Sequence, residues 1–439
     1  MEREKPIFSD GSYSSYSNSS SNEANQLTTD KNQRNKIGQG SYGRVYRSAY
    51  LTENNERIIV ALKKIPINSN EGIPLNAVRE MSVLSGLNHI NIVKLIETSI
   101  NSPTKKKKGF VSIIYEYIDH DISSLLQSKF IFSLQSIKLI LYQILKGVQY
   151  LHGKSILHRD IKTANILINH DGIVKIADFG LARTFKKFYP INLRKMTINV
   201  VTLWYRAPEL LLNDQGYNTS IDVWSIGCVF AELLICEPIF PGKTVIEQIQ
   251  KIFEVIGSPN SDEIKRFKML ELNYDKKSFE SLIPSENYEN KLRDFINEKI
   301  KGDKIDDNTY DLLSKMLKFN SNERITVDDC LKHDFFSDIN ELEKKHVLKN
   351  EMNKIKGEYH GMKLRTVKIG QIENIKIENN KIIDKDIFYK RDEEKKKKGK
   401  ILQILKNEDD DDDDSESNFI KYNNDDKEIK NNLMDLLKY

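Results

Sequence analysis

The stretch LQSIKLILYQILKGVQYLH, residues 134–152, constrains the fold more than any other part of the chain. Its apolar residues recur at the spacing of one face of an α-helix, which predicts a long helix that is buried along that face. We therefore expect a mainly helical lobe from about residue 121 to the LKHDFF motif at residues 331–336. The apolar face consists of Ile137, Ile140, Leu141, Ile144, Leu145, Val148 and Leu151.

The segment before this helix has the composition of a sheet. VYRSAYL at residues 45–51, RIIVALKKI at 57–65 and GFVSIIYEYI at 109–118 predict strands bounded by polar turns. At 439 residues the chain is too long for one ordinary core. The expected fold class is α+β, with a small β-rich N-lobe over about residues 34–117 and a larger, mainly helical C-lobe over about 118–337.

The two ends of the chain differ in composition from the middle. Residues 1–33 are rich in Ser and Asn with few large aliphatic side chains, so we expect disorder there. Residues 338–439 are expected to form a charged, largely low-complexity tail that includes the acidic run 409–414. The basic clusters at 390–391 and 395–398 are compatible with a nuclear signal and equally with a solvated basic tract.

Charge and cysteine content argue against several classes of protein. The net charge is only +4, a small difference between 68 basic and 64 acidic residues, so direct nucleic-acid binding is not expected. Cys228, Cys236 and Cys330 show no metal-ligand spacing and are too few for a disulfide framework, which favours a reducing compartment, cytosol or nucleus. No apolar run reaches membrane-spanning length, and we expect no signal peptide and no membrane partner.

A glycine-rich segment, IGQGSYGRV, precedes a lysine on a predicted strand. Gly38, Gly40 and Gly43 allow the backbone to approach a phosphate chain, because no Cβ intervenes. The segment lies between strands and not at a strand-to-helix junction, which argues against a dinucleotide-binding fold. Lys63 then becomes a candidate to hold the α and β phosphates. Alone, the two features would be an ordinary turn and a solvated lysine.

The segment ILHRDIKTANILI, residues 156–168, carries three polar groups between apolar stretches. Asp160 can accept the proton of an attacking hydroxyl, Lys162 can neutralise a transferring phosphoryl group, and Asn165 offers a metal ligand. Asp178, in IADFGLAR, leaves an apolar strand, as a magnesium ligand requires. Together the two segments favour phosphoryl transfer over a polar loop with a capping Asp.

The complete, ordered set of motifs resembles the eukaryotic protein kinases over roughly residues 35–337. The set comprises the glycine-rich segment, Lys63, His158-Arg159-Asp160, Asp178-Phe179-Gly180 and Ala207-Pro208-Glu209. The resemblance implies a bilobal protein kinase fold that binds ATP and Mg²⁺, with Asn165 and Asp178 as metal ligands. Tyr115 matches the bulky position that limits the pocket behind the adenine. The residues that match ATP-binding positions are Ile37, Gly38, Gly40, Gly43, Val45, Ala61, Lys63, Glu116, Ile118 and Asn165.

The same resemblance assigns other residues to stability and not to chemistry. It implies that Arg324, in NERIT, pairs with the carboxylate of Glu209. It also implies that Asp222 and Trp224 anchor the central helix of the larger lobe.

The segment GIPLNAVREM predicts the start of a short amphipathic helix. Successive helical residues point about 100° apart, so Arg79 and Glu80 cannot serve one partner. The longer stretch GIPLNAVREMSVLSGLNHINIVKL is similar to the cyclin-dependent kinases. That resemblance implies a catalytic Glu80 that pairs with Lys63 in the active enzyme. It also implies that Leu75 and Val78, on the outward face, meet a cyclin, although isolated exposed aliphatics are ordinary in themselves.

Thr197, in RKMTINVVTLWYRAPE, stands where the cyclin-dependent kinases carry an activating phosphothreonine. Arg79, Arg159 and Arg183 occupy the family's three arginine positions for this group. A phosphate adds about −1.5 to −2 charge and three acceptor oxygens, which suit an arginine cluster. The resemblance therefore implies an upstream activating kinase as a partner.

Further positions bear on substrate choice and inhibition. Val200, Val201 and Arg206 match the family's pocket for a proline after the phosphorylated residue, which implies proline-directed Ser/Thr specificity. Tyr42 matches an inhibitory phosphotyrosine position in several relatives, and it can equally be a packing tyrosine.

Several details are similar to the transcription-elongation kinases, the catalytic subunit of positive transcription elongation factor b and the yeast Bur kinase. HRDIKTAN and the long stretch between Asp178 and Thr197 favour this branch, whereas PLNAVRE departs from it and leaves a cell-cycle or other cyclin-dependent kinase open. The branch implies a T- or K-type cyclin, a nuclear location with the cytoplasm as the alternative, and the C-terminal domain of RNA polymerase II as substrate.

Two hypotheses come from other functional classes. A catalytically silent kinase-fold scaffold would present its outward helix face to partners, but intact Lys63, Asp160, Asn165 and Asp178 disfavour it. Alternatively, the charged tail would tether the protein to chromatin or nucleic acid.

Overall fold

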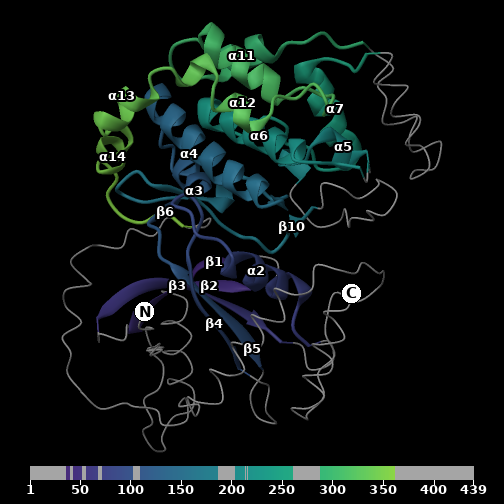
Figure 1. Cartoon of the computed structure of the whole chain (residues 1–439). Helices are drawn as coiled ribbons and strands as arrows, with labels where there is room; N and C mark the ends of the chain where they lie inside the picture. The colour runs from purple at the N-terminus through teal and green to yellow at the C-terminus, as the bar shows by residue number, and fades with distance from the viewer. Residues whose placement is uncertain are drawn as a thin grey trace, which may run out of the picture. The chain divides into compact units, whose positions relative to one another are not determined.

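The computed structural model describes residues 36–39, 43–51, 56–67, 72–101, 109–185, 203–212, 214, 216–260 and 287–360 (Figure 1). These residues form two compact units. The N-terminal unit contains the chain up to Asn88 together with Lys94–Tyr117, and the C-terminal unit contains His89–Val93 and the described chain from Ile118 onward. Within the described residues the polypeptide therefore passes between the units three times, the last time between Tyr117 and Ile118.

An antiparallel sheet of five strands, in the order β1-β2-β3-β5-β4, forms most of the N-terminal unit. All but the first and last residues of β5 are buried, as its run of apolar side chains predicts. Tyr50, Val60, Leu62 and Ile114 form a small apolar cluster on this sheet. The strands are β1 (Lys36–Gln39), β2 (Arg44–Leu51), β3 (Arg57–Pro66), β4 (Leu95–Asn101) and β5 (Phe110–Glu116).

Helix α2 (Leu75–Ser85), in the N-terminal unit, lies against β4 and follows Pro74. Pro74 fits the position before the helix because its missing N–H would have no intrahelical acceptor there. Helical spacing brings only Ala77, Glu80 and Leu84 into buried positions. Leu75 and Val78, which were expected on the outward face, are partly exposed.

Two helices, α4 (Leu134–Gly153) and α6 (Ser220–Ile235), pack against each other at the core of the C-terminal unit (Figure 1). The apolar face predicted for residues 134–152 is confirmed, since all seven of its residues are buried. Every residue of α6 is buried, which agrees with a helix that is hydrophobic almost all round.

The other elements of the C-terminal unit surround these two helices. Its short strands form two small antiparallel sheets, β6-β8-β9 and β10-β7, which carry the loops with the conspicuous polar residues. These elements are β6 (His120–Asp121), α3 (Ile122–Gln127), β7 (Ile156–Leu157), η1 (Thr163–Asn165), β8 (Ile166–Ile168), β9 (Val174–Ile176), β10 (Arg183–Thr184), η3 (Leu203–Tyr205), α5 (Pro208–Leu211), α7 (Val245–Ile256), α10 (Leu292–Lys299), α11 (Asp307–Met316), α12 (Val327–Cys330), η5 (Asp334–Phe336), α13 (Ile339–Lys344) and α14 (Val347–Met352).

The C-terminal unit continues past residue 337, where the charged tail was expected to begin. Helices α13 and α14 pack against α4, and the carboxylate of Glu351 accepts hydrogen bonds from the hydroxyls of Ser133 and Ser136, each at 2.6 Å. The structure differs from the expectation here because a few apolar residues among many charged ones suffice to dock two short helices. The expected tail from residue 361 onward and the expected disordered segment 1–33 lie outside the described residues. The buried apolar residues of α13 and α14 are Ile339, Leu342, Leu348 and Met352.

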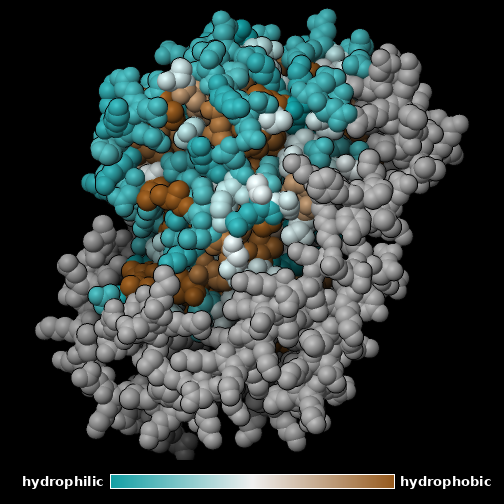
Figure 2. Space-filling view, viewed as in Figure 1, coloured by the Kyte–Doolittle hydropathy of each residue, from teal (hydrophilic) through white to brown (hydrophobic). Residues whose placement is uncertain are grey.

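The expected α+β class, with a sheet-rich N-terminal part and a mainly helical C-terminal part, is confirmed. Within the described residues no helix has both the length and the apolar composition to cross a membrane. On the face shown in Figure 2, the surface of the C-terminal unit is mostly hydrophilic and is interrupted by small hydrophobic areas. Large apolar side chains such as Ile90 and Ile131 are exposed singly, which is ordinary for a folded protein.

Candidate active site

The glycine-rich segment is the connection of a β-hairpin in the N-terminal unit. Gly38 of β1 pairs with Val45 of β2, and residues 40–42 at the tip lie outside the described part of the chain. A Cβ added to Gly43 would lie 2.7 Å from the backbone oxygen of Lys64 on β3. The close approach of the neighbouring strand therefore requires glycine at this position, independently of any phosphate.

Lys63 and Glu80 form an ion pair within the N-terminal unit. Lys63 lies on β3 opposite Val45, and its Nζ is 2.7 Å from Oε2 of Glu80 on α2. Glu80 is only 2% exposed, although it is a carboxylate. The hydroxyl of Tyr115, on β5, donates a hydrogen bond to the other oxygen, Oε1. Both oxygens of the buried carboxylate therefore have a hydrogen-bond donor.

The residues that match adenine-binding positions lie on the strands and at the end of β5. Ala61 pairs with Tyr115 across β3 and β5. The carboxylate of Glu116 accepts a hydrogen bond from the backbone N–H of Lys94 at 2.7 Å, and the backbone N–H of Glu116 donates to the Lys94 oxygen at 3.1 Å. Ile118 is the buried first residue after the chain enters the C-terminal unit.

Asp160 lies in the loop between β7 and η1 of the C-terminal unit. Its Oδ2 accepts hydrogen bonds from Lys162 Nζ at 2.8 Å and from Asn165 Nδ2 at 2.9 Å. Its Oδ1 is buried and has no hydrogen-bond partner among the described residues. Burial raises the pKa of Asp160 against the opposing charge of Lys162, and the nearby carboxylate of Asp178 raises it further. One carboxylate oxygen is thus held in place while the other is left to accept a proton.

Two residues near Asp160 adopt left-handed backbone conformations that are unusual for residues other than glycine. Arg159, in the loop between β7 and η1, has φ of 68°, and Asp178, in the segment after β9, has φ of 64°. The fully buried carboxylate of Asp222, at the start of α6, accepts hydrogen bonds from the backbone N–H groups of His158 at 3.0 Å and Arg159 at 2.9 Å. Although burial acts to raise its pKa, the hydrogen bond from His152 holds the pKa of Asp222 below its usual value. The charged Asp222 therefore fixes the strained part of the loop.

The two candidate metal ligands are connected through the backbone between them. The N–H of Ala177 donates to the carbonyl oxygen of Asn165 at 2.9 Å, which brings Asp178 next to η1. The buried ring of Phe179 makes an edge contact with His158, with 4.8 Å between ring centroids. Because the amide nitrogen of Asn165 donates to Asp160, the amide oxygen is the atom that Asn165 can offer to a metal ion.

Three arginines of the C-terminal unit lie within electrostatic range of one another. Burial lowers the pKa of Arg159, and the positive charges of Arg183 and Arg206 lower it further. The guanidinium of Arg159 also lies 5.8 Å from the centre of the Tyr217 ring. Clustered guanidinium groups suit a doubly charged anion such as a phosphate. Arg79, the remaining arginine of the expected pocket, belongs to the N-terminal unit.

Five of the predicted site residues lie outside the described part of the chain. Gly40 and Tyr42 belong to the tip of the hairpin, and Thr197, Val200 and Val201 belong to the segment before η3. Their roles stay predictions.

The residues expected to hold the larger lobe together are in contact. Arg324 donates to Glu209 through two nitrogens, at 2.7 and 3.0 Å, and both side chains are almost completely buried. The guanidinium of Arg324 also lies 5.1 Å from the centre of the Trp224 ring. This ion pair joins α5 to the chain that follows α11.

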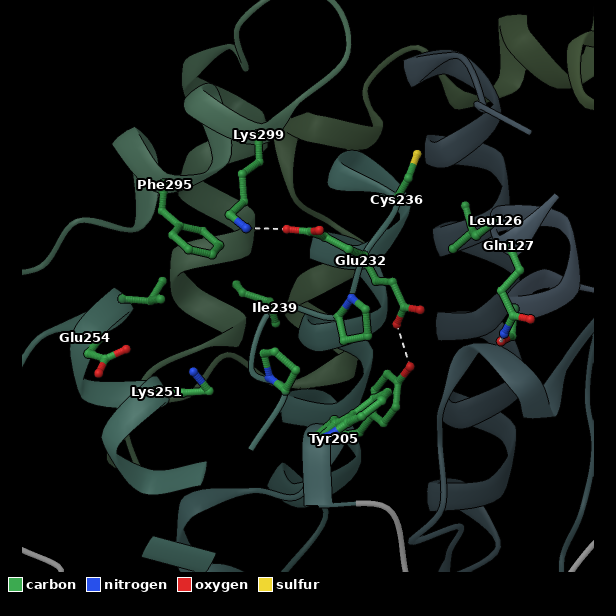
Figure 3. A pocket seen from close by; sticks show the side chains of 16 residues that line it. Leu126, Gln127, Tyr205, Glu232, Cys236, Ile239, Lys251, Glu254, Phe295 and Lys299 are labelled. Atoms are coloured by element: carbon green, nitrogen blue, oxygen red, sulfur yellow. Dashed lines mark hydrogen bonds and ion pairs between the residues drawn. The ribbon is translucent and has the colours of Figure 1, made fainter. Parts of the chain in front are cut away.

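A second buried carboxylate, Glu232, supports η1 next to the loop that carries Asp160, and sequence analysis did not identify it. The hydroxyl of Tyr205 donates to Glu232 Oε2 at 2.5 Å (Figure 3). The hydroxyl of Thr163, in η1, donates to Glu232 Oε1 at 3.1 Å. Burial raises the pKa of Glu232 to about 7. The available signal was a single glutamate within the apolar run of α6, and its two partners are distant in sequence.

A cavity of about 580 Å³ lies beside this network in the C-terminal unit. Figure 3 shows Leu126, Lys251 and Phe295, from α3, α7 and α10, around it together with Tyr205 and Glu232. The residues predicted for the active site do not line this cavity. Tyr205 and Glu232 line this cavity, and Glu232 also binds Thr163 near the loop of Asp160. Asp160 itself does not line the cavity.

Glu232 should make the stability of the protein fall as the pH rises from about 4.5 to about 7. Its pKa in the folded protein, about 7, lies above the ordinary value of 4.5, so the folded state binds the proton more tightly in this range. The stabilisation by protonated Glu232 is complete below pH 4.5, and it is lost as the pH rises through about 7. In thermal denaturation from pH 5 to 8, Glu232→Gln should lose this slope. The exposed Glu254 is the control, and a Glu254→Gln variant that also loses the slope would contradict the assignment.

Comparison with known proteins shows what the chain resembles. The family model described as protein kinase domain matches residues 32–336. Probable cyclin-dependent kinase 10 of Dictyostelium discoideum is 41% identical over 305 residues, which cover 68% of this chain and 77% of that protein. Cyclin-dependent kinase 11B of Rattus norvegicus is 40% identical over 304 residues, which cover 69% of this chain and 65% of that protein.

A third relative matches over a shorter region. The Bur serine/threonine-protein kinase of Yarrowia lipolytica is 43% identical over 245 residues, which cover 54% of this chain and 34% of that protein. The matched region thus spans about a third of the Yarrowia protein and just under two thirds of the rat protein.

Proposed function

This chain belongs to the protein kinase family, and we propose that within it the protein acts as a cyclin-dependent, proline-directed Ser/Thr kinase. One observation carries the chemical part of the proposal. Asp160 has one oxygen held by Lys162 and Asn165 and a second oxygen that is buried without a partner among the described residues. A substrate hydroxyl that reached this second oxygen could transfer its proton there.

In the proposed chemistry the two carboxylate oxygens of Asp160 have different roles. Oδ1 accepts the proton of the substrate hydroxyl as that hydroxyl attacks phosphorus. Lys162 stays bound to Oδ2 and places positive charge where negative charge develops on the transferring group. Bound Mg–ATP would supply the γ-phosphoryl group with ADP as the leaving group, and its Mg²⁺ would neutralise charge on the phosphates.

Each unit contains residues that could hold the nucleotide or its metal ion. Lys63, oriented by Glu80, would hold the phosphates, and Asn165 and Asp178 would hold Mg²⁺. This small donor set fits the ion, because Mg²⁺ commonly takes one or two protein ligands and completes its shell with phosphate oxygens and water. Within the described residues there is no cluster of three or more His, Cys, Asp or Glu side chains that could form a metal cage.

Two regulatory contacts belong to the proposal. Leu75 and Val78, partly exposed on α2, would meet the cyclin. Phosphorylated Thr197 would bind Arg159 and Arg183, which already lie close enough to repel each other, together with Arg79. Phosphorylation would then lower the repulsion within the arginine cluster.

The substrate and the cyclin are proposed from the sequence features of the branch. Val200, Val201 and Arg206 would accept the proline after the phosphorylated residue. A T- or K-type cyclin would activate the kinase. The substrate would be the C-terminal domain of RNA polymerase II in the nucleus. Similarity to the Yarrowia kinase supports this branch. The Dictyostelium and rat relatives are named as other cyclin-dependent kinases, and another member of that group is the second candidate function.

A peptide assay tests the proposal. With a T- or K-type cyclin present, a Ser-Pro peptide from the polymerase C-terminal domain should be phosphorylated at least about tenfold faster than its Ser-Ala counterpart, because the alanine peptide leaves the proline pocket unfilled. Equal rates would contradict proline direction. Full activity without any cyclin would contradict cyclin dependence, and activation by a mitotic cyclin alone would favour the second candidate.

A further inference from the structure

Few apolar contacts, and no side-chain cap at its N-terminus, hold helix α2 on the sheet of the N-terminal unit. Its buried apolar side chains are Ala77 and Leu84. The residue before the helix, Pro74, makes no side-chain capping hydrogen bond, and neither end turn carries a charge that complements the helix dipole. Such caps and charges commonly stabilise a helix. The position of α2 therefore depends strongly on its third buried residue, Glu80.

Glu80 is held from two different strands. Lys63 of β3 binds Oε2 at 2.7 Å, and the hydroxyl of Tyr115 of β5 donates to Oε1. The Lys63 bond alone would leave the carboxylate free to rotate about its last torsion. A second donor on the other oxygen fixes both the carboxylate plane and the side that faces the lysine.

Tyr115 is itself rigidly placed. Its strand, β5, lies between β3 and β4, where Tyr115 pairs with Ala61 on one side and with Leu95 on the other. The side chain is only 7% exposed. A ring held in this way has few rotamers, so its hydroxyl remains aimed at Glu80 with little loss of entropy on forming the bond.

We propose that Tyr115 is a positioning residue for the Lys63–Glu80 pair, and that its hydroxyl sets how firmly the chain holds nucleotide phosphates. Without the hydroxyl, Glu80 loses the hydrogen bond that ties it to β5, and α2 is held less firmly on the sheet. Lys63 then orients the phosphates less often. The inference rests on the proposed function only in taking Lys63 as the phosphate ligand.

The test compares two ligands on the full chain by titration calorimetry. Tyr115→Phe removes the hydroxyl and keeps the ring, so the affinity for Mg–AMP-PNP should fall about tenfold, which corresponds to one hydrogen bond to a charged group of ordinary net strength. Affinity for adenosine, which has no phosphate for Lys63, should change less than twofold. A purely structural role for Tyr115 would weaken both ligands equally, and that result would overturn the proposal.

The sheet offers a matched control in Tyr50 of β2. It is 3% exposed, and its hydroxyl donates to the carboxylate of Glu97 at 3.2 Å, away from Lys63. Tyr50→Phe therefore removes the same kind of bond from the same sheet. It should leave the affinities for both ligands unchanged, and an equal loss of Mg–AMP-PNP affinity in this variant would overturn the specific role of Tyr115.

A double-mutant comparison shows whether Tyr115 acts through Glu80. In a Glu80→Gln background, adding Tyr115→Phe should cost less than about twofold in Mg–AMP-PNP affinity, because the pair that the hydroxyl positions is already lost. A full tenfold additional loss would mean that the hydroxyl acts elsewhere.

Hydrogen exchange provides a readout that needs no nucleotide. Tyr115→Phe should speed amide exchange across residues 75–85 relative to Tyr50→Phe, because α2 opens more often. Unchanged exchange would overturn the proposal even if affinity changes. A wild-type chain that binds adenosine and Mg–AMP-PNP equally would instead contradict Lys63 as phosphate ligand, and hydrogen exchange would still decide the role of Tyr115.

Discussion

Asp160→Asn should reduce phosphorylation of a Ser-Pro peptide by about 100- to 10,000-fold, the usual contribution of a general base. Asparagine keeps the size of the side chain and one oxygen for Lys162, but it cannot accept the proton of the substrate hydroxyl. Binding of Mg–AMP-PNP should persist, because Lys63 and Asp178 remain. The melting temperature should stay the same or rise, since burying the charge of Asp160 is unfavourable, as its raised pKa shows.

Asp171 provides the control for this variant. It is an exposed aspartate of the C-terminal unit that pairs with Lys349 at 2.8 Å. Asp171→Asn should leave the rate of peptide phosphorylation within about twofold, because surface ion pairs contribute little. If Asp160→Asn also kept its activity within twofold in the cyclin-bound protein, the assignment of Asp160 as base would be wrong.

Arg324→Met should lower the free energy of unfolding by about 3–5 kcal/mol, because it leaves the carboxylate of Glu209 buried without its charged partner. The pair is almost wholly excluded from solvent, with 0% and 6% side-chain exposure. Arg324 also donates to the backbone oxygen of Ser220 at 2.8 Å, so its loss leaves an acceptor at the start of α6 as well. The measurement is chemical denaturation of the full chain.

Two further variants separate the buried pair from the effect of removing any arginine. Arg293 pairs with Asp307 at the surface, with 42% and 90% side-chain exposure, and Arg293→Met should cost at most about 1 kcal/mol. Adding Glu209→Gln to Arg324→Met removes the unpaired charge and should recover part of the lost stability. If Arg324→Met cost no more than Arg293→Met, the buried pair would not stabilise the lobe.

Much of the fold was predictable because its signals are local. The apolar spacing of residues 134–152 predicted α4, and strand composition predicted β2, β3 and β5 nearly to their ends. The contacts within the candidate catalytic segment were predictable for the same reason, since Asp160, Lys162 and Asn165 lie within six positions of one another, and both Lys162 and Asn165 bind Asp160 in the structure. Protein kinase membership followed from the order of such local motifs and is confirmed.

Predictions were weaker where composition concealed a few decisive residues. The charge-rich sequence after residue 337 suggested a tail, yet α13 and α14 dock on α4 through a small number of apolar contacts. Gly43 was attributed to phosphate binding. The structure adds a packing reason for glycine at this position, because any Cβ there would clash with the backbone oxygen of Lys64.

The sequence by itself determined the two kinds of unit and the protein kinase motifs in which the proposed site residues lie, because helical periodicity, strand composition and short motifs depend only on neighbours along the chain. Tertiary structure alone decided how those residues are held. Asp222 lies 63 positions from Arg159, Glu232 lies 69 positions from Thr163, and Tyr115 lies 35 positions from Glu80. Each is a buried polar group whose partner only the folded chain can supply, because burial without a hydrogen bond would be strongly unfavourable.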